Sequence, residues 1–189
     1  MTHHEDTRAL ILQAALKSIA VNGFHGTSMS KVAQAAKISA ATIYYYFEGK
    51  DELINELYKT IKANLLRAVI VEQDETLPLR AQLRQIIKNL IKYLILHPQD
   101  AAFMEQFDRS PYNQLATQAE LAPAFKRLMA VIDQAKQEQI IKDLPNELLE
   151  ILTMDLASSI ARKHAAGLLN VTEALLDQAV DACWDAIRR

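Results

Sequence analysis

Apolar residues recur at helical spacing along most of the chain, and the most informative stretch lies between residues 27 and 53. Its first half places Met29, Val32, Ala33 and Ala36 at i, i+3, i+4 and i+7, which is one face of a helix with Thr27 as its expected N-cap. The period then breaks, and a second short helix is expected over residues 40–46. The pattern predicts two short helices joined by a tight turn.

The second of these helices has few apolar side chains to hold it in place. Ser39 is its expected N-cap, and Ile43 and Phe47 are its inward anchors. Seven residues make a rod of roughly 10 Å, long enough to cross a DNA major groove. Its outward residues are small at the leading end and hydroxylated behind: Ala40, Ala41, Thr42, Tyr44 and Tyr45. We expect the threonine to meet a base edge or a thymine methyl group, and the tyrosine hydroxyls to reach phosphates.

A lysine opens the helix that follows. Lys50 stands in the first turn, where the helix dipole disfavours a cation, whereas the adjacent Asp51 and Glu52 suit that position. A phosphate bound at the helix N-terminus would account for the lysine. We therefore count Lys50 among the expected DNA contacts.

This segment resembles the DNA-binding domain of the TetR family of bacterial transcriptional regulators. The resemblance is carried by about a dozen positions: Thr27, Val32, Ala33, Ile38, Ser39, Thr42, Ile43, Tyr44, Tyr46, Phe47, Lys50 and Leu53. It implies a helix-turn-helix that binds double-stranded DNA at a palindromic operator. The expected DNA-binding residues are Thr27, Ser28, Lys37, Ser39, Ala40, Ala41, Thr42, Tyr44, Tyr45 and Lys50.

The segment departs from the family pattern at two positions. Lys37 occupies a turn position where the family often has glycine, and a positive φ there would cost a lysine about 1 kcal/mol. Ala41 also stands where glycine is common, which affects how closely the helix approaches the bases. Both departures bear on the detailed base contacts.

The remaining periodicity predicts an all-α fold of about nine helices. A first helix over residues 7–21 is followed by Gly23, which can adopt a left-handed cap conformation. A helix of about twenty residues begins at Lys50, belongs to both halves of the chain and is the expected lever between them. The expected divisions are a helix-turn-helix domain over residues 1–49, a connecting helix over residues 50–71, and a ligand-binding and dimerisation domain over residues 72–189.

The last two long helices, from residue 148 onwards, combine small residues with an apolar stripe. The family resemblance implies that they pair with a second copy in a four-helix bundle, and a recognition helix of seven residues also favours two half-sites. The alternative is that the stripe seals the core of one chain. Candidate dimer residues are Ser158, Ala161, Ala165, Leu176, Val180, Cys183, Trp184 and Ile187.

The resemblance also implies a pocket for a small apolar or aromatic effector in the C-terminal domain. Aromatic, sulfur-bearing and polar side chains fall on neighbouring predicted helices there. The candidate ligand-binding residues are Tyr93, His97, Phe103, Met104, Phe107, Tyr112, Phe125, Met129 and Met154. For any one of them, ordinary core packing is an equally good interpretation.

Composition agrees with a helical, cytoplasmic protein. The 189 residues are 50% apolar with 4 Gly and 5 Pro, the N-terminus lacks the apolar core of a signal peptide, and the one cysteine, Cys183, excludes an internal disulfide. Residues 1–67 carry 8 Lys and Arg against 6 Asp and Glu, and residues 68–189 carry 13 against 17. This asymmetry is weak, so placed lysines matter more than bulk charge.

Catalytic and metal motifs do not emerge from the sequence. His3, His4, Glu5 and Asp6 are consecutive and precede the predicted helices, so we expect a solvated arm and no metal or cofactor. A helical enzyme is the least favoured alternative. A DNA-binding architectural or protein-recruiting factor without an effector is the second. The favoured hypothesis is a homodimeric repressor that a small molecule releases from its operator.

Overall fold

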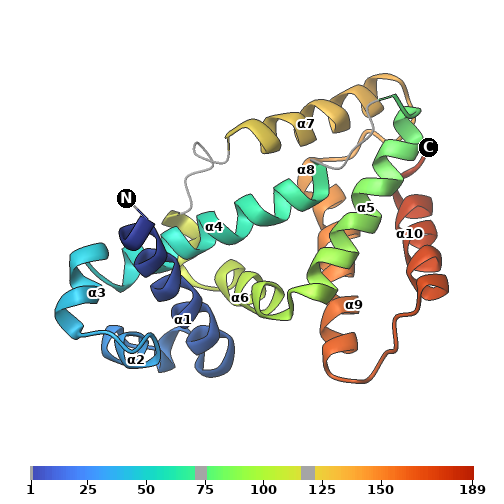
Figure 1. Cartoon of the computed structure of the whole chain (residues 1–189). Coiled ribbons are helices and arrows are strands. Elements are labelled where there is room, and N and C mark those ends of the chain that lie inside the picture. The colour runs from blue at the N-terminus through green and yellow to red at the C-terminus, as the bar shows by residue number, and fades with distance from the viewer. Residues whose placement is uncertain (1, 71–75, 116–121) are drawn as a thin grey trace. The chain divides into compact units, whose positions relative to one another are not determined.

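The computed structural model describes residues 2–70, 76–115 and 122–189, and these residues form an all-α fold (Figure 1). Because α8, η3 and α9 follow one another without a break, the described residues contain nine helical runs besides η1, in agreement with the expected fold class. The elements are α1 (Thr2–Gly26), α2 (Met29–Ala35), α3 (Ala40–Tyr46), α4 (Lys50–Ile70), α5 (Leu79–Leu96), α6 (Pro98–Asp108), the 3-10 helix η1 (Pro111–Leu115), α7 (Ala122–Gln137), α8 (Asn146–Glu150), the π-helix η3 (Ile151–Asp155), α9 (Leu156–Ala165) and α10 (Glu173–Ile187).

The chain divides into two compact units. The first contains residues 1–61 and 99–120, and the second contains residues 62–98 and 121–189. Helix α4 contributes residues to both, as expected for the connecting helix. Helix α6 and η1, which the sequence assigned to the C-terminal domain, pack instead with the N-terminal unit.

Helix α1 is longer than the sequence predicted. It begins at Thr2, so the expectation of a solvated arm before residue 7 was wrong, and an acidic residue such as Asp6 suits the first turns of a helix. At the other end Gly23 kinks the helix with φ 69° and ψ 176°. The positive φ requires a glycine, as predicted, but this ψ is not that of the expected left-handed cap.

Helix α6 supplies aromatic side chains to the core of the first unit. Phe103 and Phe107 are fully buried, and the ring of Phe107 stacks on Tyr58 with centroids 4.1 Å apart. Phe103 meets the edge of Phe24, with ring centroids at 5.6 Å. Phe103, Met104, Phe107 and Tyr112 were candidate ligand-binding residues of the C-terminal domain. In the division of the chain they belong to the first unit, whereas the other candidates belong to the second. The side chains of Phe103, Met104 and Phe107 are buried.

The core of the second unit is built on α5, which packs against both α9 and α10. The predicted apolar stripe of α10 is buried within the single chain, since Leu176, Val180, Cys183, Trp184 and Ile187 are each at most 4% exposed. The sequence alternative in which this stripe seals the core of one chain therefore accounts for these five side chains. Burial also raises the pKa of the Cys183 thiol, as expected for a small packing residue.

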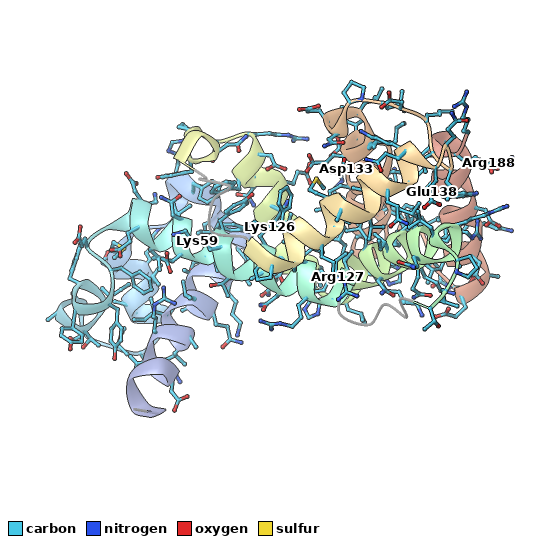
Figure 2. All side chains as sticks on the ribbon, turned by 90° about the horizontal axis from the view of Figure 1, so that it is seen from above. Lys59, Lys126, Arg127, Asp133, Glu138 and Arg188 are labelled. Carbon is cyan, nitrogen blue, oxygen red and sulfur yellow. The ribbon has the colours of Figure 1, made fainter. Side chains whose placement is uncertain are left out.

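Helix α7 is only partly covered within the second unit. Lys126 and Asp133 are exposed polar residues of α7, and the exposed Glu138 directly follows its end (Figure 2). Its apolar residues Phe125, Leu128, Met129, Val131 and Ile132 are all only half-buried. At its C-terminal end Ala135 is fully buried, and Lys136 Nζ donates a hydrogen bond of 2.8 Å to Asn146 Oδ1. The helix is thus fixed near its end while its apolar face stays partly open.

The described helices include none that is long and apolar enough to span a bilayer. Within the same residues, His, Cys, Asp and Glu side chains form no cluster of three suited to a metal ion. The side chains of residues 2–5, where the consecutive histidines stand, lie outside that description.

Candidate nucleic-acid interface

Helix α2 begins with a cap one residue later than the sequence predicted. Ser28 is the N-cap, and its hydroxyl accepts a hydrogen bond of 3.3 Å from the Lys31 amide. Thr27 is 3% exposed, and its hydroxyl donates to the Gly23 carbonyl oxygen at 2.9 Å. The interpretation of Thr27 as the N-cap was therefore wrong, because its side chain satisfies the end of α1 instead.

Helix α2 ends in a Schellman motif centred on Lys37. The Ile38 amide donates to the Ala33 carbonyl oxygen at 3.0 Å, and the Lys37 amide donates to the Gln34 carbonyl oxygen at 3.1 Å. Lys37 itself has φ 57°, the left-handed conformation expected where the family has glycine. This tight turn places α3 directly after α2 with an exposed lysine between them.

Helix α3 is capped by Ser39, as predicted. The Ser39 hydroxyl accepts from the Thr42 amide at 3.0 Å and lies 2.8 Å from the Thr42 hydroxyl. Ile43 is fully buried and Phe47 is 1% exposed, so two side chains anchor the helix to the rest of the unit. The other side of α3 remains available to a ligand as large as DNA.

The exposed surface of α2 and α3 brings most of the predicted contact residues together. Tyr44 is 56% exposed and Tyr45 is 74% exposed, whereas Thr42 is half-buried. The remaining exposed members are Ser28, Lys37, Ser39, Ala40 and Ala41. Thr27 does not belong to this surface. Hydroxyl groups and a lysine on a short, otherwise small-residue helix match the groups that bind phosphates and base edges in DNA.

Lys50 has a partner that the sequence did not predict. Its ammonium donates a hydrogen bond to the main-chain carbonyl oxygen of Phe24. Beside it, a Glu52 carboxylate oxygen accepts from the Glu48 amide at 2.5 Å, so the acidic residue caps the start of α4. The position of Lys50 in the first turn is thus explained by a contact within the protein, with no need for a bound phosphate.

Arg8 links α1 to the end of α3 and to α4. Its guanidinium carbon lies 5.3 Å from the centroid of the Phe47 ring, and its Nη2 forms an ion pair with the Glu56 carboxylate. Burial raises the pKa of Glu56, but the hydrogen bonds and charges of Lys59 and Arg8 outweigh this effect and leave that pKa below its ordinary value of 4.5. Sequence reasoning missed this positioning role, because Arg8 and Glu56 are 48 residues apart.

A cleft of about 830 Å³ lies beside the α1–α2 junction within the first unit. The ring of Tyr112 closes one wall against Phe24, with centroids 5.3 Å apart. Burial, followed by the charge of Asp51 and a hydrogen bond to it, raises the pKa of Tyr112.

Two short helices joined by a tight turn, with a hydroxyl-rich exposed second helix, define a helix-turn-helix DNA-binding protein. Comparison with known families agrees. Residues 11–57 match the family described as bacterial regulatory proteins, tetR family. Residues 78–188 match the tetracyclin repressor-like C-terminal domain. The chain belongs to the TetR family of transcriptional regulators, which is not a family of enzymes.

Solved structures give the same result. The chain is 27% identical to a TetR family regulator from Marinobacter aquaeolei VT8, with a TM-score of 0.91 over 100% of this chain and 99% of that one. It is 31% identical to a putative TetR family regulator from Vibrio parahaemolyticus, with a TM-score of 0.77 over 97% and 99% of the two chains. It shares its fold with FadR from Bacillus subtilis, which was crystallised with stearoyl-CoA, at 18% identity and a TM-score of 0.72 over 94% and 95%.

Proposed function

We propose that this regulator is a homodimeric repressor that binds a palindromic operator and is released by a small apolar or aromatic effector. The observation that carries the proposal is the exposed face of α3, where Thr42, Tyr44 and Tyr45 stand on a helix anchored by only two side chains. In this proposal Thr42 reads a base edge, while the tyrosine hydroxyls and Lys37 contact phosphates.

Dimerisation follows from the size of the recognition element. Seven residues read too few base pairs for a specific site, and two-fold pairing of half-sites solves this problem. Because the α10 stripe is buried within one chain, the dimer surface is better sought among exposed apolar residues. Ile151 is 53% exposed, Leu148 is 39% exposed and Leu156 is 36% exposed, all on the run from α8 to α9. The exposed Ala174 and Ala182 of α10 permit close approach of a second helix.

The proposed effector site is the half-covered apolar face of α7 within the second unit. Phe125 and Met129 remain candidates there, together with Met154 on η3. Met129 is tied to the neighbouring run of helices, since its sulfur lies 3.9 Å from Asn146 Nδ2. Unbranched methionine side chains adapt to ligands of varied shape, and π-helical turns often accompany functional sites. FadR, crystallised with stearoyl-CoA, indicates that this fold accommodates a large apolar ligand.

Of the remaining ligand candidates of the second unit, Tyr93 has a packing role in this proposal and His97 is exposed. Tyr93 is 7% exposed, and its ring lies 4.4 Å from that of His97 between centroids. Release of DNA then requires that the effector bind the non-DNA-binding conformation more tightly than the other. Helix α4 is the proposed link, because it contributes to both units.

The experiment that tests this proposal is selection from a pool of random duplex DNA by the purified protein, followed by sequencing and a salt series. We expect a palindrome to be enriched, and affinity for it to fall steeply with salt. Addition of medium-chain acyl and aromatic ligands to the protein–palindrome complex then tests release. Failure to enrich any sequence at low salt would contradict the DNA-binding part. An enriched sequence without two-fold symmetry would contradict the dimer.

A further inference from the structure

Helix α5 carries a row of four basic residues at every fourth position. Arg80, Arg84, Lys88 and Lys92 therefore lie along one side of the helix. This side faces α10, against which α5 packs in the second unit. The row is long enough to run alongside most of α10.

Helix α10 carries an acidic row with the same spacing, and the two rows pair in opposite directions. Lys92 Nζ lies 3.3 Å from a Glu173 carboxylate oxygen, and Lys88 Nζ lies 2.6 Å from Asp177 Oδ1. Arg84 pairs with Asp181. Three successive cations of α5 thus meet three successive carboxylates of α10, spaced by one helical turn.

The fourth pair of this series is missing. Its carboxylate would be Asp185, but Asp185 Oδ1 lies 2.8 Å from the Nε of Arg188. Arg80 instead lies over the ring of Trp184, with its guanidinium carbon 5.5 Å from the ring centroid. Among the residues that the structure describes, Arg80 has no carboxylate within ion-pair distance. Within the described residues, the row therefore ends in a cation without an anion.

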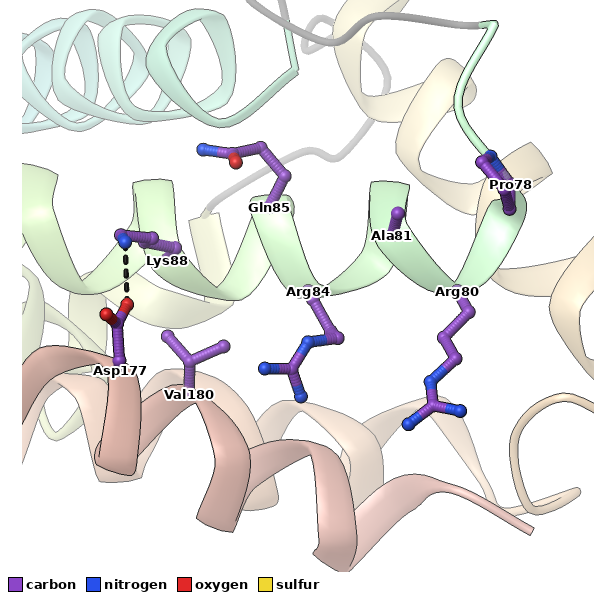
Figure 3. A pocket seen from close by; sticks show the side chains of 8 residues that line it. All are labelled: Pro78, Arg80, Ala81, Arg84, Gln85, Lys88, Asp177 and Val180. Atoms are coloured by element: carbon purple, nitrogen blue, oxygen red, sulfur yellow. Dashed lines mark hydrogen bonds and ion pairs between the residues drawn. The ribbon is translucent and has the colours of Figure 1, made fainter.

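A groove of about 460 Å³ opens at this end of the row. Figure 3 shows the guanidinium groups of Arg80 and Arg84 both directed from α5 toward α10. Small and apolar side chains complete the lining between them, and Asp177 supplies its one carboxylate. The lining residues are Pro78, Arg80, Ala81, Arg84, Gln85, Lys88, Asp177 and Val180. Lys88 and Arg84 are already paired with Asp177 and Asp181, so Arg80 is the cation of this lining that has no carboxylate partner among the described residues.

We propose that this groove binds a small molecule through an oxyanion, a phosphate or a carboxylate, which takes the place of the missing fourth carboxylate between Arg80 and Arg84. Guanidinium groups four residues apart on a helix are neighbours, and each presents a planar fork of donors that matches an oxyanion. Ala81 and Val180 provide an apolar contact for the organic part of the ligand.

Occupation of the site would strengthen the connection between α5 and α10. The existing ion pairs are exposed, with side-chain exposures of 58% for Asp181 and 61% for Asp177, so each contributes little alone. A bound oxyanion adds a further ionic contact at the end of the row where a carboxylate is missing. Because it binds the folded unit and not the unfolded chain, it should raise the melting temperature.

The test compares melting temperatures of the full-length protein in pyrophosphate and in citrate, with sodium chloride at matched ionic strength as the reference. We expect pyrophosphate, citrate or both to raise the melting temperature of the wild type by about 4 °C at tenfold excess over the dissociation constant. A rise with pyrophosphate alone would identify the ligand group as a phosphate, and a rise with citrate alone would identify it as a carboxylate. A rise with both would show that the site accepts either oxyanion. An absent rise with both probes would overturn the proposal.

Two variants locate the effect. Arg80→Gln removes the unpaired guanidinium, and Lys92→Gln is its matched control at the opposite end of the same row, outside the groove. We expect Arg80→Gln to abolish the rise and Lys92→Gln to retain it. Equal rises in both variants would show general anion screening at the surface and would overturn the site. Circular dichroism of both variants without added anion confirms that each is folded. The result is independent of operator binding.

Discussion

The ammonium of Lys50, at the start of α4, donates a hydrogen bond to the main-chain carbonyl oxygen of Phe24, near the end of α1. The two residues are 26 positions apart in the sequence, and their hydrogen bond joins the end of α1 to the start of α4. The same carbonyl oxygen also accepts a hydrogen bond of 3.3 Å from the Thr27 amide, so Lys50 adds a second, charged donor near the end of α1. Lys50 thus stabilises the end of α1, which leads into the helix-turn-helix, through a contact within the protein.

Lys50→Met should therefore destabilise the first unit by about 1.5 kcal/mol, the scale of a hydrogen bond to a charged group. Methionine keeps most of the aliphatic stem, so the loss reports the ammonium. DNA affinity should fall for all sequences, while the slope of log affinity against log salt stays unchanged. A slope reduced by about 1 would show that Lys50 also neutralises a phosphate. Denaturant unfolding and binding titrations at several salt concentrations measure both quantities.

Lys37→Gly should stabilise the protein by up to about 1 kcal/mol, because glycine adopts φ 57° without strain. Its matched control is Gln139→Gly, since Gln139 has the same φ of 57° at the end of α7. Both variants should unfold at higher denaturant concentration. If Lys37 contacts a phosphate, only Lys37→Gly should weaken DNA binding and lower the salt slope. Equal DNA binding by the two variants would remove Lys37 from the interface.

Acid should destabilise the first unit through Glu56. Its pKa in the folded protein is below 4.5, so its ionised form contributes stability that is complete above that pH and is lost as pH falls through the lowered value. Between pH 5 and pH 3 the wild type should therefore lose more stability than Glu56→Gln. Lys59→Met, which removes the largest lowering cause, should show an intermediate loss. Identical acid responses of wild type and Glu56→Gln in denaturant unfolding would contradict this prediction.

Thr42→Ala should relax base preference. The variant keeps the main-chain amide that Ser39 caps, so α3 should remain folded, but it loses the hydroxyl that is available to a base edge. We expect a loss of about tenfold on the selected operator and little change on scrambled DNA. Tyr44→Phe should instead weaken both, as a phosphate contact does. Equal losses on the two DNAs for Thr42→Ala, in parallel binding titrations, would count against base reading.

Local features of this fold were predictable from the sequence. The bounds of α3 at Ala40 and Tyr46, the cap at Ser39 and the positive φ of Gly23 each depend on a few neighbouring residues. The threonine and serine at positions 27 and 28 are both good caps, so local chemistry left the start of α2 open by one residue. The hydrogen bond from the Thr27 hydroxyl to the Gly23 carbonyl oxygen, four residues earlier, decided it.

Contacts between distant residues were not predictable from a single sequence. Nothing in the neighbourhood of Arg8 indicates that Glu56 and Phe47 lie beside it. The α10 stripe shows a related limit, since periodicity identifies a buried face but not what covers it. Here α5 of the same chain covers Val180 and Trp184. The apolar spacing of α6 likewise fits either core, so it did not indicate that α6 groups with the first unit.

The exposed apolar residues of α8 and η3 lead to the prediction for the dimer. Leu148 and Ile151 are three positions apart and therefore lie on one side of the helical run. If a second copy covers them, a charge at Ile151 would be buried without a counter-ion on association. We expect Ile151→Arg to shift the protein from dimer to monomer in sedimentation velocity, with the helical content of the monomer retained.

Leu168→Arg is the matched control for this change. Leu168 is 76% exposed after the end of α9, so an arginine there should leave both association and folding unchanged. Val180→Arg would be uninformative, because that side chain is buried within one chain and the substitution would unfold it. A monomeric Ile151→Arg should also lose affinity for a palindrome far more than for one half-site, since pairing supplies the second contact. A dimeric Ile151→Arg with wild-type operator affinity would place the interface elsewhere.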